Sequence, residues 1–405
     1  MMSLDFKRFV DIYIGIPLVY ICRLTRWCFR GSKKPRPDRG YQRVLLVKFW
    51  GIGNIAMLLP VVSAFKKKYP CVLVDFLTLK ENTGIFTSDK IFNQVYGIDC
   101  NQAIRFIKSL FKNVKILRHN QYDLVIDFEQ FARFSALVCL AIEAKHSIGF
   151  KTKGQCRHFF YTVPTAYNDH IHMTKSFMSL GFGAGIDPTL DVEPVAWDDE
   201  STGTAYIENI LREARVAKDD FLVLLHLGTS ENFIEKRWPV ENFAKLADRL
   251  IDTFKVRIAF SGLPQESYLV QRALGLMKRK EQAINFCGRL NFSQYIALIG
   301  RSDLIISSDT ASIHLGTAMS VAVVGLYGPT TPVLYGPWGK KSSLVYKKLP
   351  CSPCITNYNA KTHVCRHPDG RGACMKKISV DEVWDLLLRH YFNRDAIFSL
   401  RELHA

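Results

Sequence analysis

The stretch Arg43–Leu79 reads RVLLVKFWGIGNIAMLLPVVSAFKKKYPCVLVDFLTL and contains a complete strand–helix–strand unit. It begins with a continuous apolar run rich in β-branched residues, which is typical of a strand buried on both faces of a parallel sheet. Apolar residues at helical spacing follow the two glycines, and a second apolar run comes after the lysines. The unit therefore predicts an open α/β sheet.

The same alternation continues along the chain with one interruption. A further strand is predicted at Tyr122–Glu129, whereas Ile186–Ser201 is rich in prolines and acids and favours a linker. Beyond it, more strands with turns or polar residues at their ends are predicted at Phe221–Gly228, Arg257–Gly262, Asp303–Thr310 and Val321–Gly328. The chain has 405 residues, which is enough for two tandem Rossmann-like domains.

These patterns divide the chain into six predicted segments. A serine N-cap and early acids start the last helix at Ser379. By residue number, the segments are an N-terminal apolar and basic segment (1–40), an N-terminal Rossmann-like domain (41–185), a linker (186–201), a C-terminal Rossmann-like domain (202–349), a cysteine-rich loop (350–377) and a C-terminal helix (378–405).

The composition is that of a folded protein with an excess of positive charge. Hydrophobic residues make up 48%, charged residues 22%, and the net charge is +17. This surplus favours an anionic partner such as nucleic acid, an acidic membrane surface or a phosphorylated substrate. No nucleic-acid recognition motif is present, and no apolar run is long enough to span a bilayer.

Part of the charge surplus follows a short apolar segment near the start of the chain. The run Ile12–Cys22 is followed by a basic cluster between Arg23 and Arg39, the reverse of the order in a signal peptide. This arrangement suits reversible docking on an anionic membrane face. The alternative is an N-terminal helix packed on the protein's own core. The 11 cysteines, with no signal peptide, favour a reducing cytoplasm.

Polar residues at the strand ends are the candidate functional residues. Gly51 and Gly53 allow close backbone approach after the first strand, but position 56 is alanine, so the dinucleotide fingerprint is only partial. In the second half, hydroxyls and a lysine in His226–Pro239 suit a diphosphate. In Ser307–Ala318, Asp309 ends a strand and precedes a helix start that forms an anion site.

Taken together, these motifs resemble glycosyltransferase family 9, whose best-known members are the lipopolysaccharide heptosyltransferases. The resemblance rests on VLLVKFWGIGNIAMLLPVVSAFKKKYP, YDLVIDFEQFARFSAL, HLGTSENFIEKRWPVENFAKLADRL and DTASIHLGTAMSVAVVGLYGPTTP, in that order between about Arg43 and His390. It implies a GT-B fold with two Rossmann-like domains facing across a cleft. It also implies a nucleotide-sugar donor in the C-terminal domain and inverting transfer with no cofactor or metal.

The resemblance also implies roles for single residues of the donor side. Lys236 matches the lysine that contacts the donor diphosphate, Glu266 lies near the acid that binds the ribose, and Asp309 matches the aspartate near the donor sugar. The remaining donor-side matches are the hydroxyls Thr229 and Ser230 and the turn and histidine that hold the phosphates, Thr310, Ala311, Ser312 and His314. Extra residues separate Thr229 from Lys236, so the lysine is the firmer match.

One position departs from the family pattern. The residue after the second glycine is an aspartate in the heptosyltransferases, where it is taken as the base, but here it is Asn54. An amide accepts no proton at neutral pH. Three interpretations follow: Asp127 or Glu129 serves as the base, the acceptor needs only orientation by Asn54, or the protein binds without catalysing.

Four cysteines cluster near the C-terminus. Cys351, Cys354, Cys365 and Cys374 include one C-x-x-C pair, which makes them weak zinc candidates. The spacing of the second pair is wide for a zinc ribbon, so a reduced or redox-labile loop is the alternative.

The sequence thus predicts a metal-independent glycosyltransferase of bacterial envelope biosynthesis that lies peripherally on the inner face of the cytoplasmic membrane. Its predicted partners are a nucleotide sugar, with ADP-heptose as one candidate, and an anionic glycolipid or lipopolysaccharide-core acceptor. Nucleic acid is not an expected partner. The alternative is a catalytically silent homologue that binds a nucleotide sugar or a glycan. The sequence leaves open the sugar, the linkage and the oligomeric state.

Overall fold

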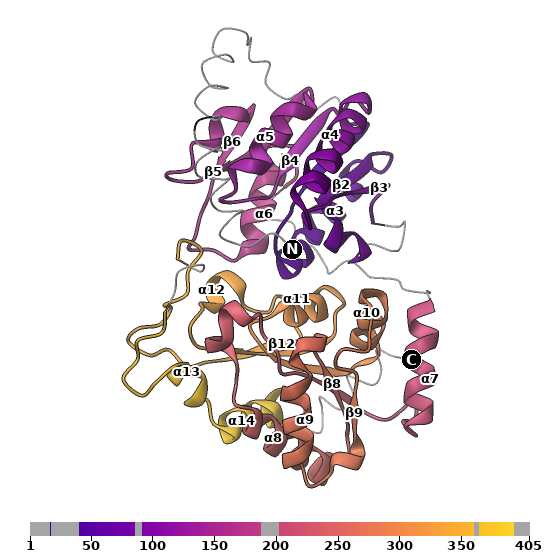
Figure 1. Ribbon diagram of the computed structural model, residues 1–405, viewed down its shortest axis with the longest axis vertical. Coiled ribbons are helices and arrows are strands. Elements are labelled where there is room, and N and C mark those ends of the chain that lie inside the picture. The colour runs from indigo at the N-terminus through magenta and orange to yellow at the C-terminus, as the bar shows by residue number, and fades with distance from the viewer. Residues whose placement is uncertain (1–16, 18–39, 86–90, 188–201, 360–363, 393–405) are drawn as a thin grey trace. The chain divides into compact units, whose positions relative to one another are not determined.

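The computed structural model describes residues 17, 40–85, 91–187, 202–359 and 364–392 (Figure 1). The chain divides into two compact units, Met1–Val195 and Ala196–Ala405. The N-terminal segment predicted to dock on a membrane lies outside the described residues, apart from Pro17 and Gly40, and so does most of the predicted linker. Within the described part of the chain, no helix is both long and apolar enough to cross a bilayer.

The first unit is built on a six-stranded sheet in which every pairing is parallel. Its strands are β1 (Arg43–Val47), β2 (Leu73–Leu79), β3 (Gln94–Ile98), β4 (Leu124–Asp127), β5 (His146–Lys151) and β6 (Val163–Ala166). The helices are α3 (Ile52–Lys68), α4 (Ala103–His119), α5 (Arg133–Ile142) and α6 (Met173–Phe182), with 3-10 turns η3 (Lys80–Ile85) and η4 (Arg157–Phe160). The inner strands β1 and β4 are apolar runs buried on both faces, as the sequence predicts, whereas the edge strands β3 and β6 are partly exposed.

The second unit repeats this plan with a second parallel six-stranded sheet. Its strands are β7 (Leu222–His226), β8 (Arg257–Ser261), β9 (Ala283–Asn285), β10 (Leu304–Ser308), β11 (Ala322–Tyr327) and β12 (Ser342–Tyr346). The helices are α7 (Thr202–Glu213), α8 (Val240–Phe254), α9 (Ser267–Leu276), α10 (Phe292–Arg301), α11 (Ala311–Ala318), α12 (Pro332–Tyr335), α13 (Ala373–Lys376) and α14 (Val380–His390). Short 3-10 turns are η5 (Glu231–Lys236), η6 (Pro264–Glu266) and η7 (Lys280–Gln282).

Both sheets have the doubly wound strand order. The first runs β3-β2-β1-β4-β5-β6 and the second β12-β11-β10-β7-β8-β9, which is the same topology read from the other edge. In each sheet the order reverses once, between β1 and β4 and between β7 and β10. Open parallel sheets bind ligands at the carboxyl ends of the strands beside this reversal. The topology therefore directs attention to the residues after these four strands.

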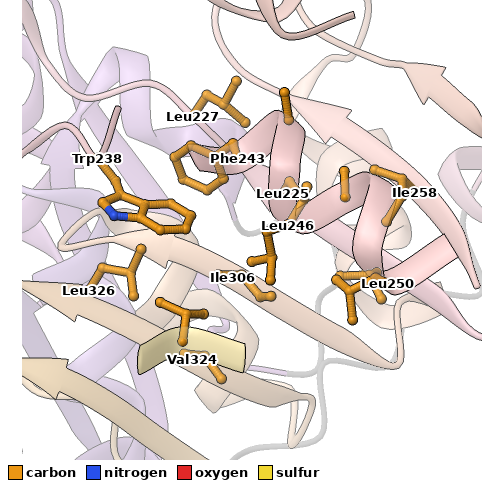
Figure 2. Packing of buried hydrophobic residues seen from close by; sticks show 14 of the residues in the cluster. Leu225, Leu227, Trp238, Phe243, Leu246, Leu250, Ile258, Ile306, Val324 and Leu326 are labelled. Atoms are coloured by element: carbon orange, nitrogen blue, oxygen red, sulfur yellow. The ribbon is translucent and has the colours of Figure 1, made fainter. Parts of the chain in front are cut away.

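One apolar core cluster of the second unit includes residues of β7, β10 and β11 and of the helices packed on them. Figure 2 shows Trp238 from the segment before α8 packed among Phe243, Leu326 and neighbouring core residues. The Trp238 and Phe243 rings meet edge to face at 4.8 Å. The indole Nε1 donates to the Ile378 carbonyl oxygen at 2.9 Å, so its polar atom is satisfied inside the core.

Two predicted segments differ in detail from the structure. The stretch predicted as a cysteine-rich loop contains the short helix α13, and the last helix, α14, ends at His390. Ser379 caps α14 as predicted: its hydroxyl accepts from the Glu382 backbone N–H, and the Glu382 carboxylate accepts from the Ser379 N–H.

Candidate functional site

The loop after β1 turns into α3 over a strained glycine. Gly51 has φ +85°, and a Cβ built on it would lie 2.8 Å from the side-chain nitrogen of Asn54. Only glycine combines that backbone angle with that close approach. Gly53 follows within the first turn of α3. The Asn54 Oδ1 atom is buried and has no hydrogen-bond partner in the described part of the chain.

The Glu129 carboxylate fixes the same loop from the end of β4. Its Oε1 accepts from the backbone N–H groups of Phe49 at 2.7 Å and Trp50 at 3.0 Å. Its Oε2 forms a buried ion pair with Lys48 Nζ at 2.8 Å. The three donors occupy both oxygens of Glu129, so this carboxylate acts as an anchor for the backbone that leads to Gly51 and Asn54.

Asp127 is enclosed more completely. Its side chain is 0% exposed, and its Oδ2 pairs with Arg157 Nη2 at 2.6 Å and accepts from the Tyr161 hydroxyl at 2.6 Å. Its Oδ1 accepts from the Glu129 backbone N–H at 2.9 Å. Burial disfavours the charged Arg157 guanidinium, but Asp127 and Tyr161 outweigh burial and raise the pKa of Arg157.

These contacts argue against the predicted role of Asp127 or Glu129 as the base. A base must reach the proton that it abstracts, within hydrogen-bond distance of the substrate. Asp127 and Glu129 are both buried and engaged by cations and N–H groups of their own unit. The structure instead makes them supports of the loop that carries Asn54.

In the second unit, Lys236 and Asp309 form an ion pair between two strand ends. Lys236 ends η5 after β7, Asp309 directly follows β10, and their side chains meet at 2.8 Å. Burial opposes ionisation of Asp309, but Lys236 and, to a smaller degree, His314 hold the pKa of that carboxyl below its usual range. A fixed, ionised pair thus lies at the topological switch point of the second sheet.

The helix α11 begins immediately after this pair. Its N-cap, Thr310, makes no side-chain capping bond to the helix, and its hydroxyl lies 2.9 Å from Ser307 Oγ. The Ser312 hydroxyl oxygen accepts from Tyr295 at 2.7 Å, and His314 is buried on the same turn. Uncapped N–H groups at a helix start, here from Ala311 onward, favour an anion.

The loop after β7 is closed by Arg237. Thr229 is buried, and its hydroxyl donates to the Phe233 carbonyl oxygen at 3.0 Å. Arg237 donates to the Thr229 hydroxyl at 3.2 Å and to its carbonyl oxygen at 2.9 Å. Thr229 therefore shapes the loop, whereas Ser230 is exposed.

Glu266 lies against the end of β7. A Cβ added to Gly228 would come within 2.0 Å of the Glu266 carboxyl carbon, so glycine makes room for this side chain. Glu266 Oε2 accepts from the Leu263 N–H at 2.7 Å. Burial raises the pKa of Glu266. At the end of β7, burial lowers the pKa of His226 to about 4, and His226 Nδ1 lies 3.0 Å from Ser261 Oγ.

The four C-terminal cysteines are free thiols that influence one another. Burial, followed by the neighbouring Cys351, raises the pKa of Cys354 to about 11. Among the described residues, no group of three or more His, Cys, Asp and Glu side chains is placed to hold a metal ion. The zinc interpretation of Cys351, Cys354, Cys365 and Cys374 therefore gains no support.

Several residues that shape these strand ends were not predicted from the sequence. Lys48 could have been noticed in the sequence, because a lysine directly after an apolar strand is unusual. In the structure its side chain is buried. Arg157 could not have been noticed, since its partner Asp127 lies 30 positions away. The same holds for Tyr295 and His226, whose partners Ser312 and Ser261 lie on other elements. Arg237 lies in the predicted loop, but its bonds to Thr229 were not predicted.

The comparisons with known proteins agree with this geometry. Two Rossmann-like units with parallel six-stranded sheets define the GT-B class predicted from the sequence. A solved family 9 glycosyltransferase from Veillonella parvula superposes with a TM-score of 0.72 at 19% identity, covering 86% of this chain and 96% of that one. The E. coli heptosyltransferase WaaC, solved with ADP, gives 0.66 at 18% identity, with 86% and 100% covered.

The chain belongs to glycosyltransferase family 9, and the family model, described as glycosyltransferase family 9 (heptosyltransferase), matches residues 110–364. Lipopolysaccharide heptosyltransferase 3 of E. coli K12 is 26% identical over 297 residues, which cover 71% of this chain and 82% of that protein. Lipooligosaccharide heptosyltransferase 2 of Haemophilus ducreyi is 24% identical over 317 residues, with 75% and 88% covered. The chain is thus a glycosyltransferase, as predicted.

Proposed function

We propose that this chain transfers a heptose from ADP-heptose to a lipopolysaccharide-core or lipid-linked acceptor, with inversion at the anomeric carbon and without a metal ion. Relatives named as heptosyltransferases and the similar structure solved with ADP support this donor and this acceptor class. The reaction takes place at the cytoplasmic face of the inner membrane. The observation that carries the proposal is the Lys236–Asp309 pair beside the uncapped start of α11.

Departure of the nucleoside diphosphate is the step that these residues assist. When the bond between the sugar and the diphosphate breaks, negative charge grows on the leaving oxygen. Fixed cations and N–H dipoles stabilise such charge best when they are already in place. Lys236, held by Asp309, and the first N–H groups of α11 supply both within the second unit. His314 on the same helix adds a further donor.

On the acceptor side, Asn54 orients the attacking hydroxyl. The amide oxygen of Asn54 accepts a hydrogen bond but takes no proton at neutral pH. The Glu129 carboxylate holds the backbone that carries Asn54 at a fixed position. The loop therefore loses little conformational freedom when the acceptor binds. As the new bond forms, the acceptor hydroxyl releases its proton to solvent water, because Asp127 and Glu129 are enclosed by their own partners.

The alternative is a homologue that binds the donor without transfer. Asn54 in place of the family's aspartate favours it, as does the enclosure of Asp127 and Glu129. The alternative predicts that the chain binds the donor but releases no nucleotide when the acceptor is added.

Two measurements on the full chain test the donor and the stereochemistry. A thermal-shift series with ADP, GDP and UDP should give a shift with ADP alone, since a ligand at a hundredfold excess over its Kd stabilises by about 2.7 kcal/mol. Proton NMR of the transferred sugar should show the anomeric configuration opposite to that of the donor. A stronger shift with GDP or UDP, or retained configuration, would refute the respective part of the proposal.

A further inference from the structure

The outer face of α4 in the first unit carries large apolar side chains in water. Ile104 is 68% exposed, Ile107 51% and Phe111 71%. Their spacing of three and four positions places them in one stripe along the helix. Contiguous exposed apolar surface of this kind marks an interaction site more often than chance exposure does.

The face of α4 next to this stripe packs on the protein's own core. Phe106, Leu110, Val114 and Leu117 pack on the core of the first unit, and α4 contacts α5 and β3. Figure 1 shows α4 beside α5 in the first unit. The helix is therefore anchored by its inner face, while more than half of each side chain in the apolar stripe stays exposed.

A row of positive charge adjoins the stripe. At 100° per residue, Lys108, Lys112 and Lys115 follow the stripe around the helix, and all three are exposed. Arg105 extends the row, and Arg118 pairs with Glu143. The seventeen residues of α4 contain no aspartate or glutamate. This one-sided charge complements an anionic partner.

We infer that α4 is a docking surface for an anionic lipid bilayer. Apolar side chains entering the acyl boundary beside lysines at the phosphate level are the arrangement of an interfacial helix. A nucleic acid would use the lysines but not the apolar stripe. The inference rests on the proposed function, in that an enzyme with a lipid-linked acceptor needs a membrane-facing surface, and it assigns that surface to described residues of the first unit.

Sedimentation of the full chain with vesicles tests the inference. The vesicles contain phosphatidylethanolamine and phosphatidylglycerol at 7:3, with pure phosphatidylcholine as the uncharged comparison. Wild-type protein should bind the anionic vesicles only, and less at high salt. The variant Lys108→Gln/Lys112→Gln/Lys115→Gln should bind about a hundredfold more weakly, since each of the three lysines contributes about fivefold. Ile104→Ser/Ile107→Ser/Phe111→Ser should lose binding by a similar factor.

Matched variants control for general loss of charge or apolar surface. Lys245→Gln/Lys278→Gln/Lys280→Gln removes three exposed lysines of the second unit, and Phe182→Ser removes an exposed ring of the first unit outside α4. Both should bind vesicles like the wild type. All variants should keep the wild-type unfolding temperature and the wild-type Kd for ADP, so that a failed docking surface is distinguished from a failed donor site.

Three results would overturn the inference. Unchanged vesicle binding of both α4 variants would place the membrane contact elsewhere, for example in residues 1–39. Weakened binding of the lysine variant alone would mean that α4 attracts polyanions without entering the bilayer. A wild-type dimer that dissociates in the apolar variant, with no vesicle binding, would make the stripe a contact between two copies of this chain.

Discussion

At the scale of single residues, a substitution of Asp127 tests whether the carboxylates at the end of β4 have a structural or a chemical role. Asp127 and Arg157 are both 0% exposed and pair at 2.6 Å. Removing one partner of a buried pair leaves an uncompensated charge and typically costs about 3–5 kcal/mol. Asp127→Asn should therefore lower the free energy of unfolding of the first unit by this amount, measured by urea denaturation.

A matched substitution makes the result specific. Glu143 pairs with Arg118 on the surface, and such exposed pairs contribute about 0–1 kcal/mol, so Glu143→Gln should leave stability nearly unchanged. If Asp127→Asn kept full stability and lost only turnover, Asp127 would be a base after all, and our structural assignment would be wrong.

His226 makes the second unit sensitive to acid. Burial lowers the pKa of its imidazole to about 4, whereas the unfolded chain protonates near 6.5. The folded state thus binds fewer protons between these values. The stabilising contribution is fully present above about pH 6.5 and is lost as the pH falls toward 4. Because the side chain is partly exposed, we expect a loss of about 1–3 kcal/mol.

The variant His226→Gln isolates this contribution. Unfolding free energies, measured from pH 7.5 to 4.5, should fall more steeply toward acid for the wild type than for the variant. Parallel curves across the whole range would show that His226 is not held neutral by the fold.

At the scale of elements, the segment before α13 supports the loop that carries Lys236. Arg371 Nε pairs with Glu235 at 2.6 Å, and Glu235, next to Lys236, is buried. The N–H groups of Cys354 and Ile355 donate to the Pro329 carbonyl oxygen at 2.9 and 2.8 Å, which ties the same segment to the turn after β11. The cysteine-rich segment thus holds two loops at the carboxyl edge of the second sheet.

Arg371→Ala should consequently weaken ADP binding. It leaves the buried Glu235 carboxylate unpaired, at a typical cost of about 1–3 kcal/mol, and loosens the loop of Lys236. We expect a rise in the Kd for ADP of about threefold to tenfold by calorimetry, with partial rescue by Arg371→Lys. Arg366→Ala, at an exposed arginine of the same segment, is the control. An equal Kd for all three variants would separate the segment from the donor site.

Elements and strand ends were more predictable than the contacts between them. The apolar run Val44–Val47 predicts β1 because a strand buried on both faces needs no distant information. Asp309 was predicted at a strand end for the same reason. The enclosure of Asp127 and Glu129 was not, since Arg157 and Lys48 reach them from 30 and 81 positions away. Local patterns place a carboxylate at a strand end but do not reveal which cations neutralise it.

At the scale of the whole molecule, two separate cores should respond differently to nucleotide. The predicted donor residues all belong to the second unit, so ADP should protect that unit first. At a hundredfold excess over Kd the stabilisation is about 2.7 kcal/mol, or roughly 5–10 °C for a unit of this size. Hydrogen exchange during thermal unfolding should show slower opening of β7 and β10 with ADP. Protection confined to β1 and β4 would assign the nucleotide to the first unit.

Acceptor-dependent release of ADP from ADP-heptose tests the central claim most directly. The full chain, incubated with ADP-heptose and a heptose-deficient lipopolysaccharide acceptor, should release ADP at a rate that depends on the acceptor. Lys236→Ala should lower kcat about a hundredfold, because loss of a fixed donor to developing charge typically costs 10²–10³. Lys245→Ala, at an exposed lysine of α8, should react like the wild type. ADP binding by the wild type without any acceptor-dependent release would contradict the account and leave a silent nucleotide-sugar-binding homologue.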